Sequence, residues 1–169
     1  MKFEAIKATL ENSQAMGYIH SCSWQKAYQH IIPADVLNTF TPARRAQVFQ
    51  EAIKTRPEEY YLFQVDSAPA GIALLHKSHE KTAPNDAGEI YAIYFHPDFW
   101  GTPATGLGLQ FCINRLQELG YKQIHIWVLA ENKRARRFYE KYGFVFDGKT
   151  QEIEIGKTLL EVRYSKTIG

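Results

Sequence analysis

The sequence is poor in cysteine and has no long apolar run. Cys22 and Cys112 are its only two cysteines in 169 residues, and they lie far apart in the chain. Such a pair provides neither a disulfide framework nor the close ligand spacing of a metal site, so we expect a reducing compartment. No apolar run approaches the roughly 20 residues that span a bilayer. Met1–Leu10 carries charges where a signal peptide would have an apolar core. We therefore expect a cytoplasmic protein with no membrane partner.

The chain also lacks a strong excess of charge of either sign. Its net charge of +2 gives no indication of a nucleic-acid partner. The basic run over residues 133–137 is short and is balanced by Glu131 and Glu140, which favours a solvated helix face over a nucleic-acid patch. His76 and His79 have no further ligand nearby in the sequence, so we expect no metal site.

The composition is that of one globular domain. A chain of 169 residues, 45% hydrophobic and 22% charged, can enclose a core without disulfide or metal staples. We expect a single domain over residues 1–169. Aromatic residues make up 14% of the chain, and we expect most of them in the core, although they also suit an aromatic-lined pocket.

Local patterns predict alternating strands and helices. The first half should contain a strand (3–9), a helix from Asn12 or Ser13 to about residue 28, a helix (42–54) that starts at Thr41-Pro42, a hairpin (60–65 and 71–76), a polar loop (78–87) and a strand (89–95). The second half should contain a helix (105–119), a strand (122–129), a helix (132–142) and two strands around Gly156 (144–166), with Gly120 and Gly143 ending the two helices. This alternation indicates a mixed sheet with covering helices.

Three segments of the second half are suited to an extended, anionic ligand. They are the strand 89–95, the loop 100–106 that opens a helix, and the run 132–144. A strand, a tight loop and a helix N-terminus bring backbone N–H groups and the positive end of a helix dipole to one point, which favours phosphates. Asn132 and Tyr139 fall two turns apart on one helix face with the small Ala135 between them, so a slim ligand could pass close to the backbone.

These segments resemble the GNAT superfamily of N-acetyltransferases. The run Asn132–Phe144 resembles the family's N-x-x-A-R-x-x-Y…G-F stretch, and Glu89–Phe95 with His96-Pro97 resembles its central strand. The similarity is specific over about residues 60 to 148. It implies an α/β fold with a mixed, mostly antiparallel sheet of six or seven strands and helices on both faces. It also implies acetyl-CoA as cosubstrate and direct transfer of the acetyl group to a primary amine of a small molecule or peptide, by a monomer or homodimer.

The resemblance assigns roles in acetyl-CoA binding to individual residues. The backbone of Ile93 and Phe95, with Tyr94 between them, would pair with the pantetheine arm as an added strand would. Asn132 would hydrogen-bond the pantetheine, and Tyr139 would lie near the thioester sulfur and protonate the departing thiolate. The pyrophosphate would bind to N–H groups of the loop formed by Gly101, Thr102, Ala104, Thr105 and Gly106.

The acceptor side has fewer distinctive residues. Glu89 would be the base that deprotonates the acceptor, commonly through water, but a charged residue at a strand end is often only solvated. Trp24, Tyr28 and Pro33 lie in the region that lines the acceptor pocket of similar enzymes, and helix packing would account for them equally well.

The phosphate loop departs from the family pattern at two positions. The ungapped match places Pro103 and Thr105 where the family has glycines, and proline has no N–H to donate. A match shifted by three residues would use Gly106 and Gly108 and would shorten the helix; we prefer the ungapped match. The departure keeps a second hypothesis open, a non-catalytic acyl-CoA-binding module of the same fold. An unrelated α/β binding protein is a third, which requires the matching spacings to be coincidental.

Overall fold

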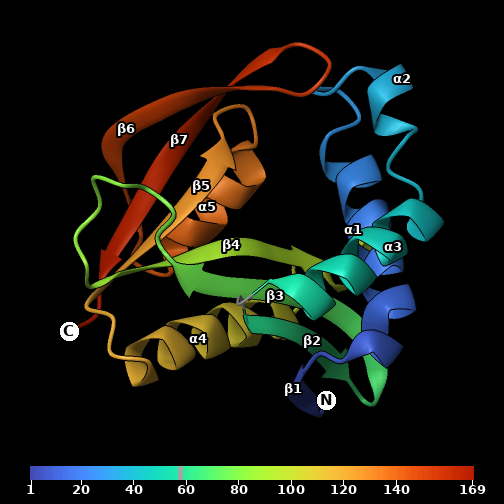
Figure 1. Cartoon of the computed structure of the whole chain (residues 1–169), viewed down its shortest axis with the longest axis horizontal. Helices are drawn as coiled ribbons and strands as arrows, with labels where there is room; N and C mark the ends of the chain where they lie inside the picture. The colour runs from blue at the N-terminus through green and yellow to red at the C-terminus, as the bar shows by residue number, and fades with distance from the viewer. Residues whose placement is uncertain (57–58) are drawn as a thin grey trace.

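The computed structural model describes residues 1–56 and 59–169, and within them the strands form one seven-stranded sheet in the order β1-β2-β3-β4-β5-β7-β6. Among the described strand pairs, only β4–β5 is parallel (Figure 1). The strands are β1 (Phe3–Lys7), β2 (Glu59–Val65), β3 (Ala68–Lys77), β4 (Ala87–Phe95), β5 (Gln123–Leu129), β6 (Val145–Glu154) and β7 (Thr158–Thr167). The helices are α1 (Ser13–Ala27), α2 (Ala34–Leu37), α3 (Pro42–Thr55), α4 (Pro103–Glu118) and α5 (Lys133–Lys141), with the short 3-10 turns η1 (Leu10–Asn12) and η2 (Pro97–Phe99). The expected fold class is confirmed.

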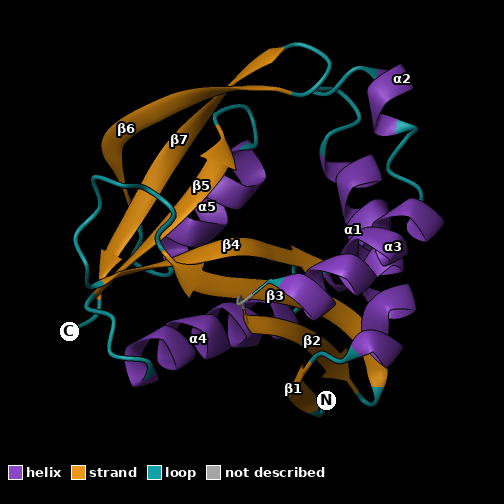
Figure 2. Ribbon diagram, in the orientation of Figure 1, coloured by secondary structure: helices purple, strands orange, loops and turns teal. Residues whose placement is uncertain are grey.

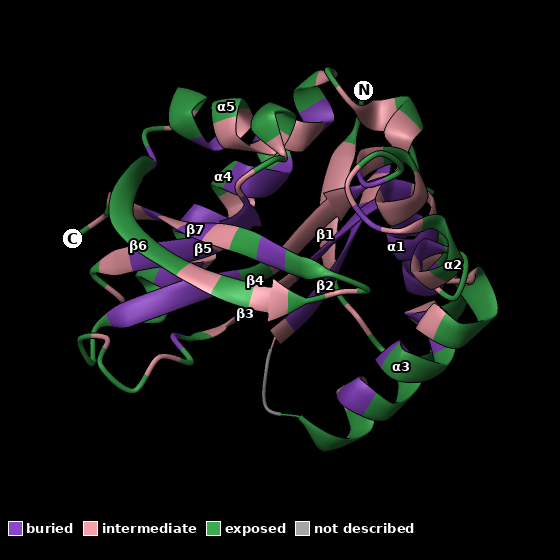
Figure 3. Cartoon of the chain, turned by 90° about the horizontal axis from the view of Figure 1, so that it is seen from above, coloured by how far each residue is buried: buried purple, intermediate pink, exposed green. Residues whose placement is uncertain are grey.

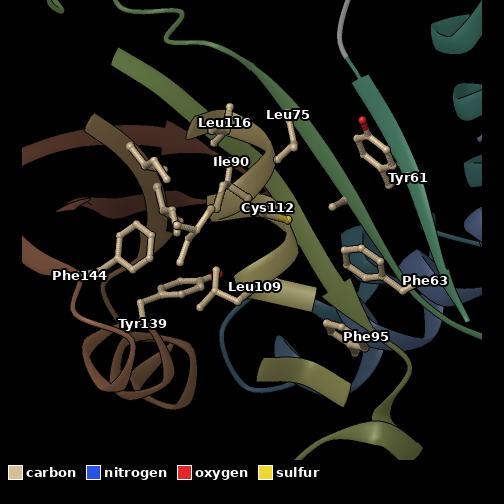
Figure 4. Packing of buried hydrophobic residues seen from close by; sticks show 14 of the residues in the cluster. Tyr61, Phe63, Leu75, Ile90, Phe95, Leu109, Cys112, Leu116, Tyr139 and Phe144 are labelled. Atoms are coloured by element: carbon tan, nitrogen blue, oxygen red, sulfur yellow. The ribbon is translucent and has the colours of Figure 1, made fainter. Parts of the chain in front are cut away.

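Helices cover both faces of the sheet (Figure 2). On one face, α1 and α3 pack on the first strands through a cluster that includes Met16, Phe49 and Leu62. The two helices approach closely at Gly17, where a Cβ would collide with the backbone of Ala46, so that position requires glycine. On the other face, α4 and α5 enclose the larger core (Figure 4).

Some predicted boundaries were wrong. The hairpin turn between β2 and β3 is only Asp66-Ser67, both with positive φ (50° and 68°), rather than the predicted four residues. Helix α4 begins at Pro103 rather than at Thr105, because proline fits the first helical position, where no intrahelical N–H bond is needed. The short α2 was not predicted.

The β6–β7 hairpin extends from the sheet toward the C-terminal end of α1. Strand β6 is largely exposed along its length (Figure 3). The turn at its end lies against the α2 region, where a Cβ on Gly156 would meet Val36 and Pro33. Leu129 and Leu159 complete this contact in a small cluster with residues that follow α1. The hairpin and α1 therefore face each other across the end of β5.

Candidate active site

Strands β4 and β5 diverge soon after they pair. Their parallel pairing covers only Ala87–Glu89 against Gln123–His125, after which β5 follows β7 as far as Leu129 while β4 stays with β3 (Figure 1). The β3–β4 register shifts between Leu74 and Leu75, so β4 has one extra residue where it leaves β5. From Ala92 to Phe95, the β5-facing edge of β4 has no strand beside it in the described part of the chain. It is available to an extended ligand with amide groups.

We call the space between the diverging strands β4 and β5 the fork. A cavity of about 930 Å³ lies in it. Most of the residues predicted to bind acetyl-CoA or act in catalysis line it: Glu89, Ile93, Tyr94, Phe95, Gly101, Thr102, Thr105, Asn132 and Tyr139. Ala104 and Gly106 are fully buried beneath the lining, in the first turns of α4. The structure therefore brings the predicted residues around one space, and Ala104 and Gly106 could contribute only through their backbone.

The N-terminus of α4 opens onto this cavity. Thr102 is the N-cap residue and Pro103 the first helical residue, so the missing proline N–H is one that the helix would leave unused. The Thr105 hydroxyl donates to the Thr102 carbonyl oxygen (3.0 Å). The positive end of the helix dipole therefore faces the cavity.

The shifted match of the phosphate loop requires a shorter helix than the observed α4, which starts at Pro103. Gly106 and Gly108 lie inside α4 and serve close packing: a Cβ on Gly106 would collide with the Tyr142 hydroxyl, and one on Gly108 would meet the rings of Phe95 and Phe63. These two glycines thus bring α4 against its neighbours, and the start of α4 at Pro103 favours the ungapped match.

Helix α5 places Asn132 and Tyr139 along the cavity. The Asn132 side-chain oxygen accepts the Ala135 N–H (3.2 Å) and caps the helix, which fixes the side chain at the cavity edge. Tyr139 is buried beside Phe144 (Figure 4). Burial raises the pKa of Tyr139, the neighbouring Tyr94 adds to the rise and Arg134 opposes it, so the phenol is a proton donor at neutral pH.

Glu89 is buried and is paired with a residue that the sequence analysis considered only as a metal ligand. The His79 Nδ1–H donates to both carboxylate oxygens of Glu89, at 2.8 and 2.9 Å. Glu89 is only 2% exposed; burial raises its pKa, and His79 opposes that rise. His79 is more exposed, at 39% of its side chain, and lines the cavity. The only sequence signal was a polar loop returning to the start of β4.

Charge is separated within the cavity. Its cationic lining comes from α5: Arg134, Arg137 and Lys141, with the Arg134 guanidinium 3.6 Å from the centre of the Trp100 ring. Its carboxylates are Glu89 and Glu161, and the latter, on β7, accepts a hydrogen bond from the Gln151 amide (2.8 Å). Arg134 of the basic run thus lies beside Trp100, in the loop that precedes α4.

Comparison with known proteins identifies the class. Residues 24–144 match the acetyltransferase (GNAT) family, and the chain belongs to that family. Three solved structures share its fold. They are the PaiA N-acetyltransferase of Thermoplasma acidophilum in complex with coenzyme A (TM-score 0.76, 16% identity, 99% of this chain and 100% of that one), an N-acetyltransferase of Staphylococcus aureus Mu50 (0.72, 18%, 99% and 99%) and the ribosomal-protein-S18-alanine N-acetyltransferase of Escherichia coli (0.68, 15%, 99% and 95%). The search of curated proteins gives no match. Among the described residues, no helix is long and apolar enough to cross a membrane.

Proposed function

We propose that this protein is an N-acetyltransferase that transfers the acetyl group of acetyl-CoA directly to a primary amine. The observation that carries the proposal is the fork between β4 and β5, with the α4 N-terminus at one side and the buried Tyr139 phenol in its lining. Acetyl-CoA is the cosubstrate of the family to which the chain belongs.

The residues of the cavity fit the parts of acetyl-CoA. The open β4 edge at Ile93 and Phe95 offers backbone groups to the amides of the pantetheine arm. The α4 N-terminus suits the diphosphate, because its dipole and the N–H groups near Thr105 favour negative charge. The cationic lining of α5 adds charge-assisted partners for phosphates.

Acid and base groups are available on two sides of the cavity. Tyr139 is the proposed acid that protonates the leaving thiolate. Glu89 is the proposed base in combination with His79: the Nδ1–H of His79 is held by the buried carboxylate, which leaves Nε2 as the atom that accepts the ammonium proton, directly or through water. Neither Cys22 nor Cys112 lines the cavity, and burial raises the pKa of Cys112, which supports direct transfer over a cysteinyl intermediate.

The test is release of free thiol from acetyl-CoA across a panel of amines, together with melting curves in the presence of CoA. We expect thermal protection, about 2.7 kcal/mol at a hundredfold excess over the dissociation constant, and turnover with at least one amine. Protection without turnover would favour the non-catalytic acyl-CoA-binding module. A melting temperature unmoved by CoA would overturn both. The free thiols Cys22 and Cys112 are compatible with our proposed location, the cytoplasm.

A further inference from the structure

The end of the cavity between α1 and the β6–β7 hairpin is aromatic and acidic. Helix α1 and its C-terminal end contribute Trp24 and Tyr28, whose rings meet edge to face at 5.0 Å. The hairpin contributes Ile153, Gln151 and Glu161. The carboxylate of Glu161 is close enough to Tyr28 to contribute to the raised pKa of that phenol, after burial and two neighbouring tyrosines. Aromatic faces beside a carboxylate are the usual surroundings of a bound ammonium group.

Glu161 has no cationic partner within the described part of the chain. Its hydrogen bond comes from the neutral Gln151 amide. The nearest arginine on its own strand, Arg163, is held by Glu80 (3.0 Å) and Asp147 (2.6 Å) and does not line the cavity. The cationic lining of the cavity lies on α5, and its Arg134 is stacked on the Trp100 ring (3.6 Å) rather than paired with Glu161. A carboxylate in a partly buried, aromatic space is stabilised when a bound cation pairs with it.

The two carboxylates of the cavity lie at different heights along the sheet. Glu89 pairs with His125 and Glu161 with Leu129, both on β5. Four residues of strand separate these positions by about 13 Å along β5. One carboxylate therefore belongs to the end with the Glu89–His79 pair, and the other to a separate point in the acceptor's path.

We propose that the acceptor carries a second positive charge, which Glu161 binds while the reacting amine lies near the Glu89–His79 pair. The substrate class is thus an extended diamine or polyamine rather than a neutral amine or an amino acid. This inference rests on the proposed function and adds the specificity-determining residue Glu161 to it. An acceptor with a carboxylate at the distal end would place like charges together, which disfavours binding.

The experiment compares acceptors of matched length: 1,6-diaminohexane, hexylamine and 6-aminohexanoate, with 1,3-diaminopropane as a short dication. For the wild-type protein we expect kcat/KM for 1,6-diaminohexane to exceed that for hexylamine at least tenfold, the size of one charge-assisted hydrogen bond. We expect 6-aminohexanoate to be the poorest acceptor, and 1,3-diaminopropane to fall below 1,6-diaminohexane because it cannot span the two positions.

Glu161→Gln then tests the residue, since it keeps the size of the side chain and removes its charge. The ratio of kcat/KM between 1,6-diaminohexane and hexylamine should fall to about two, the statistical advantage of two amines, mainly through KM. Glu152→Gln, an exposed residue of β6 outside the cavity, is the matched control and should leave the ratio unchanged.

Two results would overturn the inference and leave the proposed function standing: equal kcat/KM for hexylamine and 1,6-diaminohexane in the wild-type protein, or an unchanged ratio in Glu161→Gln. Failure of every amine, including hexylamine, to release thiol would instead overturn the proposed function and this inference with it.

Discussion

At the scale of single residues, the surroundings of Tyr139 determine the protonation state of its phenol. Its ring packs among Phe138, Phe144 and Tyr164, and burial raises its pKa. A phenol with a raised pKa stays protonated at neutral pH, so its hydroxyl is available to donate a hydrogen bond, and then its proton, to the leaving thiolate. The frame of Asn132, Ala135 and Gly143 could be read from the sequence, whereas the degree of burial required the fold.

Tyr139→Phe should lower kcat by about 10²-fold or more while the affinity for CoA and the melting temperature remain close to wild type. The change removes only a hydroxyl group. The control is Tyr164→Phe, which removes a phenol bonded to Glu140 and Arg136 outside the cavity. That variant should lose stability and keep its turnover. An unchanged kcat in Tyr139→Phe, with chemistry shown to be rate-limiting, would make Tyr139 a packing residue.

A second prediction at this scale concerns the His79–Glu89 pair. Replacing His79 should have a different consequence from replacing Glu89. His79→Ala should lower kcat by roughly 10²-fold, and added imidazole should restore part of it, since the position lines an open cavity. Glu89→Gln should lower kcat too, because a neutral amide does not stabilise the positive charge that His79 gains when Nε2 accepts the ammonium proton, and imidazole should not help.

The same rates measured against pH separate a catalytic from a structural role for His79. Wild-type kcat/KM should fall on the acidic side where Glu89 takes up a proton, because burial raises the pKa of Glu89 and His79 only partly opposes that rise. In His79→Ala that limb should move to higher pH, because the residue that opposes the rise in the pKa of Glu89 is gone. If His79→Ala is as fast as wild type at every pH, the base is another group.

At the scale of elements, the sequence was informative wherever the signal was local. Thr41-Pro42 starts α3, and the Thr41 hydroxyl oxygen accepts the Arg44 N–H (3.3 Å). Gly120 and Gly143, with φ of 94° and 88°, end α4 and α5 as predicted. The four-residue α2 and the His79–Glu89 contact were missed, because a single turn and a contact across a polar loop have no periodic pattern.

The phosphate loop shows the limit of a motif argument. Pro103 fits the first position of α4 because no helical partner needs its N–H there, but that free N–H is also one that a phosphate could have used, so the predicted loss of one donor stands as a prediction. The glycines that seemed able to replace the missing ones, Gly106 and Gly108, are fixed by packing against Tyr142 and Phe95. Only the three-dimensional structure distinguishes a glycine needed for close packing from one needed for phosphate.

Thr105→Asp tests α4 as the phosphate site. The carboxylate would face the diphosphate, and like charges about 4 Å apart cost about 4 kcal/mol at an effective dielectric near 20, or about three orders of magnitude in binding. The unliganded protein should be as stable as wild type or more so, since aspartate suits the first turn of a helix. Calorimetric titration with CoA measures the loss.

Gln110→Asp is the control for this helix, because it adds the same charge at an exposed position outside the cavity. It should bind CoA as wild type does. Wild-type affinity in Thr105→Asp would mean that the phosphates do not bind at the α4 N-terminus, and the cationic residues of α5 would become the better candidate.

At the scale of the whole molecule, the dependence of stability on pH should come in part from one buried histidine. The layer of α1 and α3 holds His20 in a cage of aromatic rings that includes Trp24, Phe49 and Tyr94. Among the described residues, His20 Nδ1 has no hydrogen-bond partner. Burial, with a smaller effect of the Arg45 charge, lowers the pKa of His20 to about 3. The folded protein therefore keeps this side chain neutral over most of the acidic range.

This buried histidine should make the molecule less stable in acid. Unfolded His20 binds a proton below about pH 6.5, whereas folded His20 does so only near pH 3. Unfolding therefore takes up a proton between these values, and stability falls as the pH drops through 6.5 toward 3. The loss attributable to His20 between pH 7 and pH 5 is about 2 kcal/mol. His20→Phe, whose ring suits the aromatic cage, should remove that part of the loss. Urea titrations of both proteins at pH 7 and pH 5 measure how much unfolding free energy each protein loses. Subtracting the loss in His20→Phe from the loss in wild type leaves the part due to His20, because the other titrating groups cancel. Equal losses in wild type and His20→Phe would show that His20 takes up its proton in the folded protein as readily as in the unfolded chain.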